Sequence, residues 1–579
     1  MERMRAGLSK DLIARVLGGA PKWTTLELES RFPARQLPDG AFVTRVAPSP
    51  TGFMHLGTLY QMLIAKKLAA QSGGVFFLRI EDTDTKREVA GATDIILKCA
   101  REFSLTPDEG PEFGGEYGPY FQSQRRDIYH SVAAELLARG QAYPCFLSAD
   151  DMEKIRDEQK MLGLPTGIYG DWARDREILP DEILARLDAG EVPSIRLYST
   201  GDRNTKIFYN DKVRGRLAFP ENDEDIVLIK SNDGLPTYHF AHLCDDHFMR
   251  TTLVQRGEEW LASLNLHLQL FRMMNWDAPE YIHVATINKL DDATGNSRKL
   301  SKRTDPEANT MNYLENGWPV EAVLNYLFNI VASGFEEEHA KKPNTTIWNY
   351  PIKIKKIPQS PALFNMQKLE WWAREFIATL PVDELTRRVV AWADEYSQEW
   401  AKILGINSPL AGESQSELVR DAVGGKKCTT ENSMPPTDAQ TRASTPPQGG
   451  SNYLSAILGI ERDNPKRVRK DFINWRQTLE QIEFFFDEKF NLQSKEYRVE
   501  SIDKEVLKKF LETFNINDDK DAWWEKIQAI AAELGISNGD AAMALRVAIT
   551  GRTNTPDLYS IMQVMGDTRV RTRIQNAAK

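Results

Sequence analysis

Apolar and polar positions alternate in two different ways along the first hundred residues. Residues 42–47 form a short, mostly apolar run that predicts a buried strand, and the Pro- and Gly-containing residues 48–52 end it. Apolar residues then recur at helical spacing between 59 and 68, and a second apolar run at 75–80 precedes an acidic turn at 81–84. This order of strand, helix and strand predicts a doubly wound parallel sheet.

Residues 104–220 break that alternation with mixed helical and strand-like patterns, which indicates an insertion between two halves of the sheet. Strand-like runs return at 226–230, 252–255 and 281–287, and a helix-like pattern covers 260–274. The sheet is therefore expected to resume after the insertion.

The pattern is mainly helical from about residue 310 onward. Amphipathic runs such as 366–380 and 383–400 place their Trp and Leu residues at helical spacing. Residues 405–452 are instead dominated by Ser, Thr, Gly, Pro and Gln, which predicts a disordered loop or linker. A chain of 579 residues is too long for one hydrophobic core, so roughly three or four compact units are expected.

Together these patterns predict an α/β protein: a doubly wound parallel domain that carries an inserted α+β domain and is followed by an all-α C-terminal region. Residues 1–40 resemble a polar extension of this fold. The expected boundaries are the extension at 1–40, the first half of the sheet at 41–103, the insertion at 104–220, the second half at 221–309, and helical domains at 310–380 and 381–579.

Composition and charge exclude several classes of protein. The chain is 41% hydrophobic and 27% charged, which is typical of a water-soluble globular protein. No apolar run approaches the ~20 residues that a membrane helix needs, so no membrane association is expected. The net charge is −10, so any bound nucleic acid must be held by a local basic face.

Cysteine usage and the N-terminal residues favour a cytoplasmic protein. The four cysteines lie far apart without a CxxC pair, which argues against a disulfide framework and against a Cys-rich zinc site. Arg3, Arg5 and Arg15 are interrupted by acidic residues, and no apolar segment precedes a small-residue cleavage site. A cleaved transit peptide within residues 1–40, and with it an organelle matrix, remains the alternative.

The first candidate chemistry lies in residues 48–58, with the sequence PSPTGFMHLGT, directly after a predicted strand. Glycines let a phosphate approach the backbone, and the N-terminus of the following helix offers free N–H groups and the positive end of its dipole. The imidazole of His55 could donate to a phosphate oxygen there. A structural histidine on a turn is the alternative for this short motif.

The second candidate is the basic loop 297–303, with the sequence SRKLSKR. Taken alone, such a charged run is most often a solvated surface segment. Paired with the first motif across a doubly wound sheet, its ammonium groups could meet the charge that develops on phosphates during group transfer.

These motifs carry a resemblance to a known family. Residues 45–52 (RVAPSPTG) with 55–57 (HLG) are similar to the "HIGH" region of glutamyl-tRNA synthetases, and 299–303 (KLSKR) to their "KMSKS" loop. Five further segments follow the order of that family: 79–84, 211–215, 236–240, 245–247 and 256–260. The sequence thus resembles the bacterial-type glutamyl-tRNA synthetases along nearly its whole length.

The resemblance implies a class I synthetase fold and an ATP-dependent ligase. Glutamate would react with ATP to give glutamyl-adenylate, which would pass its acyl group to the 3′ end of tRNA(Glu), with tRNA(Gln) as a further candidate acceptor. Magnesium would accompany ATP, and a monomer is expected. The insertion would contact the tRNA acceptor end, residues 310–380 its stem, and residues 381–579 its anticodon.

The resemblance also implies roles for individual residues. The catalytic candidates are His55, Lys299, Ser301 and Lys302. ATP would contact Pro48, Ser49, Gly52, His55, Gly57, Thr58, Glu259, Leu300 and Lys302. Glutamate, an anion at both carboxylates, needs guanidinium groups and a partner for its ammonium, and the family pattern places these at Arg45, Ser49, Glu81, Tyr238 and Arg256. The tRNA-binding candidates are Arg467, Arg469, Arg546 and Arg552.

Some of these residues have alternative interpretations. Glu81 and Asp84 could cap a helix after the turn, and Tyr238 could be a core aromatic residue. His242 stands where many relatives carry a different residue, so its contact with substrate stays open. Thr58 replaces the second histidine of the signature, which leaves His55 alone for the imidazole role.

No zinc and no protein metal cage are expected. The zinc-binding members of the family carry a Cys cluster in the insertion, whereas this chain offers only Cys145 there. Residues 244–247 (CDDH) look like four metal ligands, yet adjacent residues cannot all face one ion, and support of the active-site loop is the better interpretation.

Three other functions fit the sequence less well. A nucleotidyltransferase that does not act on tRNA would not need the long helical C-terminal half. A tRNA-binding paralogue without catalysis would not need the intact loop at 299–303. Glutaminyl-tRNA synthetases usually carry Pro-Asn-Gly before the His and Met in the lysine loop, whereas this chain has Ser49-Pro-Thr51 and Leu300.

Overall fold

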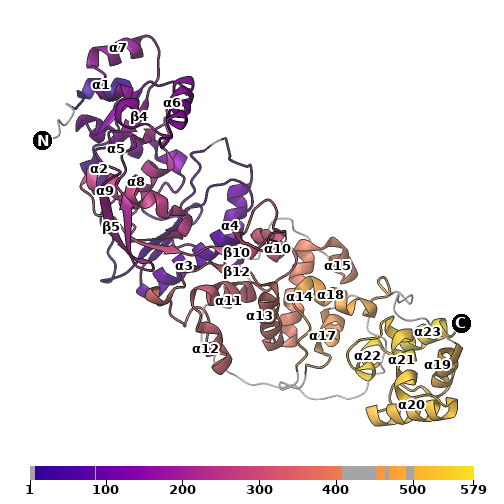
Figure 1. Cartoon of the computed structure of the whole chain (residues 1–579). Helices are drawn as coiled ribbons and strands as arrows, with labels where there is room; N and C mark the ends of the chain where they lie inside the picture. Colours follow the sequence, from indigo (N-terminus) through magenta and orange to yellow (C-terminus); the bar gives the residue numbers. More distant parts are fainter. Residues whose placement is uncertain (1–6, 85, 292, 407–450, 463–467, 491–500) are drawn as a thin grey trace. The chain divides into compact units, whose positions relative to one another are not determined.

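The computed structural model describes residues 7–84, 86–291, 293–406, 451–462, 468–490 and 501–579 (Figure 1). The chain divides into two compact units, which are described separately. Unit 1 contains residues 1–311 and 324–364, and unit 2 contains residues 312–323 and 365–579.

Two pairs of parallel strands form the centre of unit 1. β1 (Val43–Val46) pairs with β2 (Val75–Leu78), and β8 (Leu253–Gly257) pairs with β9 (Glu280–Val284). The two pairs meet where the N–H of Thr252 donates to the carbonyl of Val43 at 3.0 Å. Every residue of β1 and β8 is buried, as expected of parallel strands that are covered on both faces. The predicted doubly wound α/β fold is therefore confirmed.

Helix α3 (Leu56–Ser72) connects β1 to β2 and lies deep in the unit. Leu59, Met62 and Leu63 are fully buried, and so is Ile64 beside them. His55 caps the N-terminus of α3 through its side chain, and Gly73 ends the helix with a φ of 72°, a left-handed conformation that favours glycine. These two ends fix where the connection leaves each strand.

The inserted region carries a second, antiparallel sheet. β3 (Ala142–Cys145), β4 (Ser194–Leu197) and β7 (Val227–Ile229) pair in the order β3–β4–β7, and β5 (Lys206–Asp211) and β6 (Gly215–Pro220) form a separate hairpin. The expectation that residues 226–230 rejoin the parallel sheet was wrong, because Val227 and Ile229 pair antiparallel with β4. An apolar run of this length identifies a buried strand but not its partner.

The single strand expected at 281–287 is divided between two sheets. β9 ends at Val284, and β10 (Ile287–Leu290) pairs antiparallel with β11 (Ser297–Lys299) and parallel with β12 (Ala362–Leu363). The remaining elements of unit 1 are α4 (Ala92–Glu102), η1 (Gln122–Arg125), α5 (Arg126–Ala138), α6 (Ala149–Met161), η2 (Gly170–Trp172), η3 (Arg174–Glu177), α7 (Pro180–Asp188), α8 (Tyr238–Phe248), η4 (Glu258–Ser263), α9 (Leu264–Met274), η5 (Pro306–Ala308), α12 (Phe335–Lys341) and η6 (Ile354–Lys356).

Residues 7–40 are part of the core of unit 1, which the polar composition of this segment did not predict. α1 (Lys10–Val16) and α2 (Thr25–Arg31) bury Leu12, Ile13 and Leu28 in the same hydrophobic cluster as residues of α5, α8 and α9. Glu29 accepts hydrogen bonds from His247 and Arg250, both at 2.5 Å. The apolar stripe of α1 is short, so the charged residues around it dominate the average composition of the segment.

Unit 2 consists of helices (Figure 1), and their buried apolar residues form one hydrophobic cluster. They are α13 (Met366–Thr379), α14 (Val382–Tyr396), α15 (Gln398–Ile403), α17 (Ser451–Gly459), α18 (Trp475–Ile482), η7 (Glu483–Phe485), α19 (Ser501–Thr513), α20 (Lys520–Leu534), α21 (Asn538–Thr550), α22 (Leu558–Met565) and α23 (Asp567–Ala578). Helices α10 (Thr310–Glu315) and α11 (Val320–Val331) straddle the boundary between the units. The predicted helical C-terminal region is confirmed, while the expected linker at 405–452 lies almost entirely outside the described residues.

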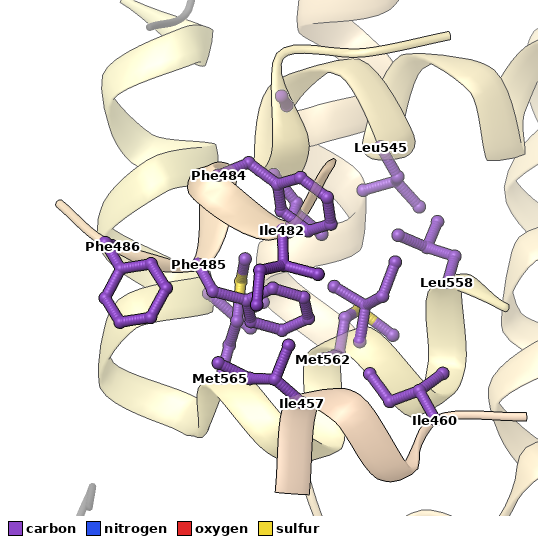
Figure 2. Packing of buried hydrophobic residues seen from close by; sticks show 14 of the residues in the cluster. Ile457, Ile460, Ile482, Phe484, Phe485, Phe486, Leu545, Leu558, Met562 and Met565 are labelled. Atoms are coloured by element: carbon purple, nitrogen blue, oxygen red, sulfur yellow. The ribbon is translucent and has the colours of Figure 1, made fainter. Parts of the chain in front are cut away.

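Figure 2 shows the centre of this core, where Ile482 and Phe485 pack among Ile457, Met562 and Met565. Phe484, Phe485 and Phe486 are each at most 3% exposed. No helix in the described ranges is both long and apolar enough to span a membrane.

We expect Phe485→Ala to destabilise unit 2 by about 3–5 kcal/mol, because it removes a buried aromatic ring and leaves a cavity. Chemical unfolding followed by circular dichroism measures the effect. Trp524→Ala is the control, because Trp524 is 38% exposed and its loss should cost far less. Equal shifts for the two variants would contradict the packing described above.

Candidate active site

A cleft of about 410 Å³ lies at the carboxyl ends of β1, β2, β8 and β9. This edge is where parallel α/β sheets bind their ligands, and the volume suits a small molecule. Twelve of the residues predicted from sequence line it: Arg45, Pro48, His55, Gly57, Thr58, Glu81, Tyr238, Arg256, Glu259, Lys299, Leu300 and Lys302. Ser49, Gly52 and Ser301 lie outside this lining.

His55 joins the first motif to the lysine loop. Its Nδ1 accepts a hydrogen bond from the backbone N–H of Gly57 at 2.9 Å, so Nε2 carries the proton and donates to the carbonyl of Leu300 at 3.2 Å. Burial lowers the pKa of His55, and the charges of Lys299 and Lys302 lower it further. The imidazole is therefore neutral at pH 7 and has a defined tautomer.

The lysine loop is held by an ion pair behind it. The guanidinium of Arg298 donates two hydrogen bonds to Asp305, at 2.6 and 2.8 Å, and Asp305 also accepts from the backbone N–H of Ser301 at 2.7 Å. These bonds hold the pKa of Asp305 well below its usual range. Neither Arg298 nor Asp305 was singled out from the sequence, although both lie within or next to the recognised motif.

The two lysines of the loop reach the cleft from this fixed backbone. Lys299 forms an ion pair with Glu259, and the ammonium of Lys302 lies 5.5 Å from the ring centroid of Phe53. Partial burial lowers the pKa of Lys302. The loop therefore presents two cations beside His55 and the N-terminus of α3.

Buried charges form one wall of the cleft. Arg45 lies 3.2 Å from Asp246, which also accepts from the fully buried Arg79 at 2.8 Å. Arg79 contacts Glu81 at 3.4 Å as well. Burial raises the pKa of Glu81 to about 7, despite the opposing charges of Arg79 and Arg45. Sequence reasoning gave Arg79 no individual role and predicted only a supporting role for the segment that contains Asp246, while the burial of both side chains is visible only in the fold.

Arg256 forms part of another wall, among histidines. It donates to His283 at 2.9 Å and to His267 at 3.1 Å, and it is 5% exposed. Tyr238 lies next to these side chains, and its ring centroid is 4.4 Å from that of Trp260. Tyr238 therefore lines the cleft and is not only a core residue.

The helix-capping alternative for Glu81 and Asp84 is wrong. The next helix, α4, begins at Ala92 with Gly91 as its N-cap, and Asp84 pairs with Arg87 at 2.6 Å. The turn that carries Glu81 is instead fixed by its own backbone N–H, which donates to the carbonyl of Pro48 at 3.0 Å.

Within residues 244–247, Asp245 and Asp246 support the site through ion pairs and hydrogen bonds. Asp245 accepts from Arg125 at 2.6 Å and from Tyr129 at 3.0 Å, and Asp246 accepts from Arg45 and Arg79. Within the described ranges, no group of three or more His, Cys, Asp or Glu side chains is arranged to hold a metal ion.

The tRNA-binding candidates of unit 2 make hydrogen bonds within the protein. Arg469 pairs with Asp471 at 2.6 Å, Arg546 donates to the carbonyl of Pro556 at 3.0 Å, and Arg552 pairs with Glu483 at 2.9 Å. Arg467 lies outside the described residues. Their role in tRNA binding stays a prediction.

Comparison with known proteins defines the class. Residues 41–371 match the family model "tRNA synthetases class I (E and Q), catalytic domain", and residues 470–578 match "Anticodon binding domain". The chain is thus an aminoacyl-tRNA synthetase of class I, a ligase.

Relatives narrow this class to one family. The glutamate–tRNA ligase of Acetivibrio thermocellus is 40% identical, over 94% of this chain and 95% of its own, and that of Clostridium perfringens strain 13 is 38% identical, over 94% and 96%. The crystal structure of glutamate–tRNA synthetase from Elizabethkingia anophelis superimposes with a TM-score of 0.68 at 26% identity, covering 93% of this chain and 99% of that one. The chain belongs to the glutamate–tRNA ligase family.

The partly buried His239 predicts how the stability of the protein depends on pH. Burial, and after it the charge of Arg256, lower the pKa of His239 to about 4. In the unfolded chain His239 titrates near 6.5, so between about pH 6.5 and 4 the unfolded state binds more protons. The free energy of unfolding should therefore fall as the pH falls through this window.

The variant His239→Gln tests this contribution. Its unfolding free energy should depend less steeply on pH, by up to about 1.4 kcal/mol per pH unit, in urea titrations between pH 7 and pH 4.5. Glu81 has the opposite effect on the pH dependence of stability, because its raised pKa makes the folded state bind the extra proton. This effect is the same in the wild-type protein and the variant, so it does not change the difference between them. If the unfolding free energies of the wild type and the variant depended equally on pH, His239 would make no such contribution.

Proposed function

We propose that the cleft activates L-glutamate with ATP and transfers it to the 3′ end of tRNA(Glu). The observation that carries this proposal is the convergence of His55, Lys299 and Lys302 on one cleft that also contains Arg45 and Arg256. Cations near the helix N-terminus suit a triphosphate, and the two arginines suit a substrate with two carboxylates.

In the first half-reaction, a carboxylate oxygen of glutamate attacks the α-phosphorus of ATP and pyrophosphate leaves. His55 and Gly57 hold the phosphates, Lys302 stabilises the charge on the α-phosphate and the leaving group, and Lys299 and Ser301 assist. Pro48, Ser49, Gly52, Thr58, Glu259 and Leu300 complete the ATP site. Magnesium would accompany ATP, without a protein cage, and would supply neutralisation of part of the triphosphate charge.

Glutamate is recognised in the wall beside the phosphates. Arg45 and Arg256 pair with its carboxylates, and Glu81 pairs with its ammonium, assisted by Ser49 and Tyr238. The raised pKa of Glu81 fits this role, because a ligand ammonium would favour the ionised carboxylate that burial disfavours.

In the second half-reaction, the terminal ribose hydroxyl of tRNA attacks the glutamyl carbonyl and AMP leaves. The inserted region contacts the acceptor end, and unit 2 reads the anticodon through Arg467, Arg469, Arg546 and Arg552. We propose that the enzyme works as a cytoplasmic monomer without zinc.

Aminoacylation with purified tRNA(Glu) and tRNA(Gln), ATP and labelled glutamate tests the proposal. Label should reach tRNA(Glu), and the result with tRNA(Gln) decides whether the enzyme charges one tRNA or two. If label reached neither tRNA, the proposal would fail. ATP–pyrophosphate exchange in the presence of tRNA then separates a synthetase from a tRNA-binding protein without catalysis.

Lys302→Ala should lower the rate of adenylate formation by orders of magnitude, since its ammonium meets charge that develops only in the transition state. Pyrophosphate exchange measures this rate, and filter binding should show nearly unchanged affinity for tRNA. The matched control is Lys341→Ala, in α12, whose ammonium pairs with Glu337 on an exposed face. Equal loss of exchange and of tRNA affinity in Lys302→Ala would make the loop structural.

A further inference from the structure

The guanidinium of Arg256 carries a buried charge that no carboxylate in the described part of the chain neutralises. Arg256 is only 5% exposed, and none of the ion pairs among the described residues includes it. A buried charge without a counterion is costly, so this position is built to receive an anion. The groups that surround it are neutral rings instead.

One ring fixes the Nε edge of the guanidinium. Because arginine stays protonated, its Nε–H donates to Nε2 of His283, at 2.9 Å. Nδ1 of His283 therefore carries the ring proton and donates to Asp211 at 2.7 Å. Asp211 thus holds His283 in the tautomer that can accept from Arg256.

A second ring fixes Nη1. Nη1 of Arg256 donates to Nδ1 of His267 at 3.1 Å, so the proton of His267 is on Nε2, which donates to Nδ1 of His239 at 3.0 Å. His267 and His283 are both fully buried. Each therefore presents a fixed acceptor to the arginine.

The third nitrogen of the guanidinium, Nη2, makes no such contact with the residues that the structure describes. Nη2 of Arg256 is buried and has no hydrogen-bond partner among the described residues, while the side chain lines the cleft. An unsatisfied buried donor requires an explanation, and a ligand oxygen supplies one.

We propose that His267 and His283 are positioning residues that orient Arg256 so that its Nη2 binds the side-chain carboxylate of the substrate. They would thereby set the preference for glutamate over glutamine. The proposal rests on the proposed function. With Nε and Nη1 engaged, the guanidinium cannot turn to suit another group. A side-chain amide would bring its own N–H₂ donors toward a cation, whereas a carboxylate offers only acceptors.

Ring-preserving and acceptor-preserving variants separate this role from simple packing. His267→Phe and His283→Phe keep an aromatic ring but lose the acceptor. His267→Asn keeps an acceptor close to the place of Nδ1, and His283→Gln keeps one close to the place of Nε2. His239→Phe removes only the acceptor that fixes the tautomer of His267, at a partly exposed position.

Steady-state pyrophosphate exchange, with tRNA present, gives KM for glutamate, KM for ATP and kcat for each variant. The Phe variants at 267 and 283 should raise KM for glutamate about tenfold or more, the effect of losing one hydrogen bond to a charged group, with KM for ATP and kcat within about twofold. Their preference for glutamate over glutamine should fall, and the Asn and Gln variants should recover most of the loss. His239→Phe should raise KM for glutamate severalfold.

Two results would overturn the proposal. One is an unchanged KM for glutamate in the Phe variants. The other is a parallel change of kcat and both KM values that Asn and Gln do not rescue, which would leave the rings a packing role. If the Phe variants do not fold, His239→Phe decides, and an unchanged KM for glutamate there would sink the idea. Failure of the proposed function is a separate result, because the wild-type enzyme itself would then form no glutamyl-tRNA.

Discussion

The pairing of buried carboxylates with buried arginines is the constraint on which the catalytic unit depends. Asp246 accepts from Arg45 at the end of β1 and from Arg79 just beyond β2, and the neighbouring Asp245 accepts from Arg125. These two neighbouring residues of α8 thus connect the ends of β1 and β2 to η1. Removal of one partner would leave an uncompensated charge inside the protein, which costs far more than an exposed ion pair is worth. The position of Arg45 in the cleft follows from this arrangement.

The same constraint explains what the sequence could and could not predict. The strand, glycine turn and helix around His55 are local features, and the fold class follows from their alternation, so both could be inferred from residue patterns. Burial and pairing are properties of the folded chain. Nothing near Arg298 indicates that Asp305 will hold the lysine loop, and nothing in the run 226–230 indicates that it joins the antiparallel sheet.

Unit 2 shows a related limit of sequence reasoning. Arginines cluster near the C-terminus at positions 569, 571 and 573, yet Arg573 is 4% exposed and donates to the carbonyls of Phe484 and Ile549. A guanidinium carries five donors and can donate to several backbone carbonyls at once. Arginine is therefore suited to the interior of a helical domain as well as to its surface. Residue type alone does not distinguish these two uses.

The first helices of the chain matter for anyone who would shorten it. The family model begins at residue 41, and a fragment cut there would keep every residue of the cleft. It would also uncover the apolar sides of α5 and α8 against which Leu12, Ile13 and Phe32 lie, and His247 would lose the carboxylate of Glu29. Newly bared apolar surface promotes self-association. A truncated enzyme of this kind should therefore aggregate although every residue that lines the cleft is present.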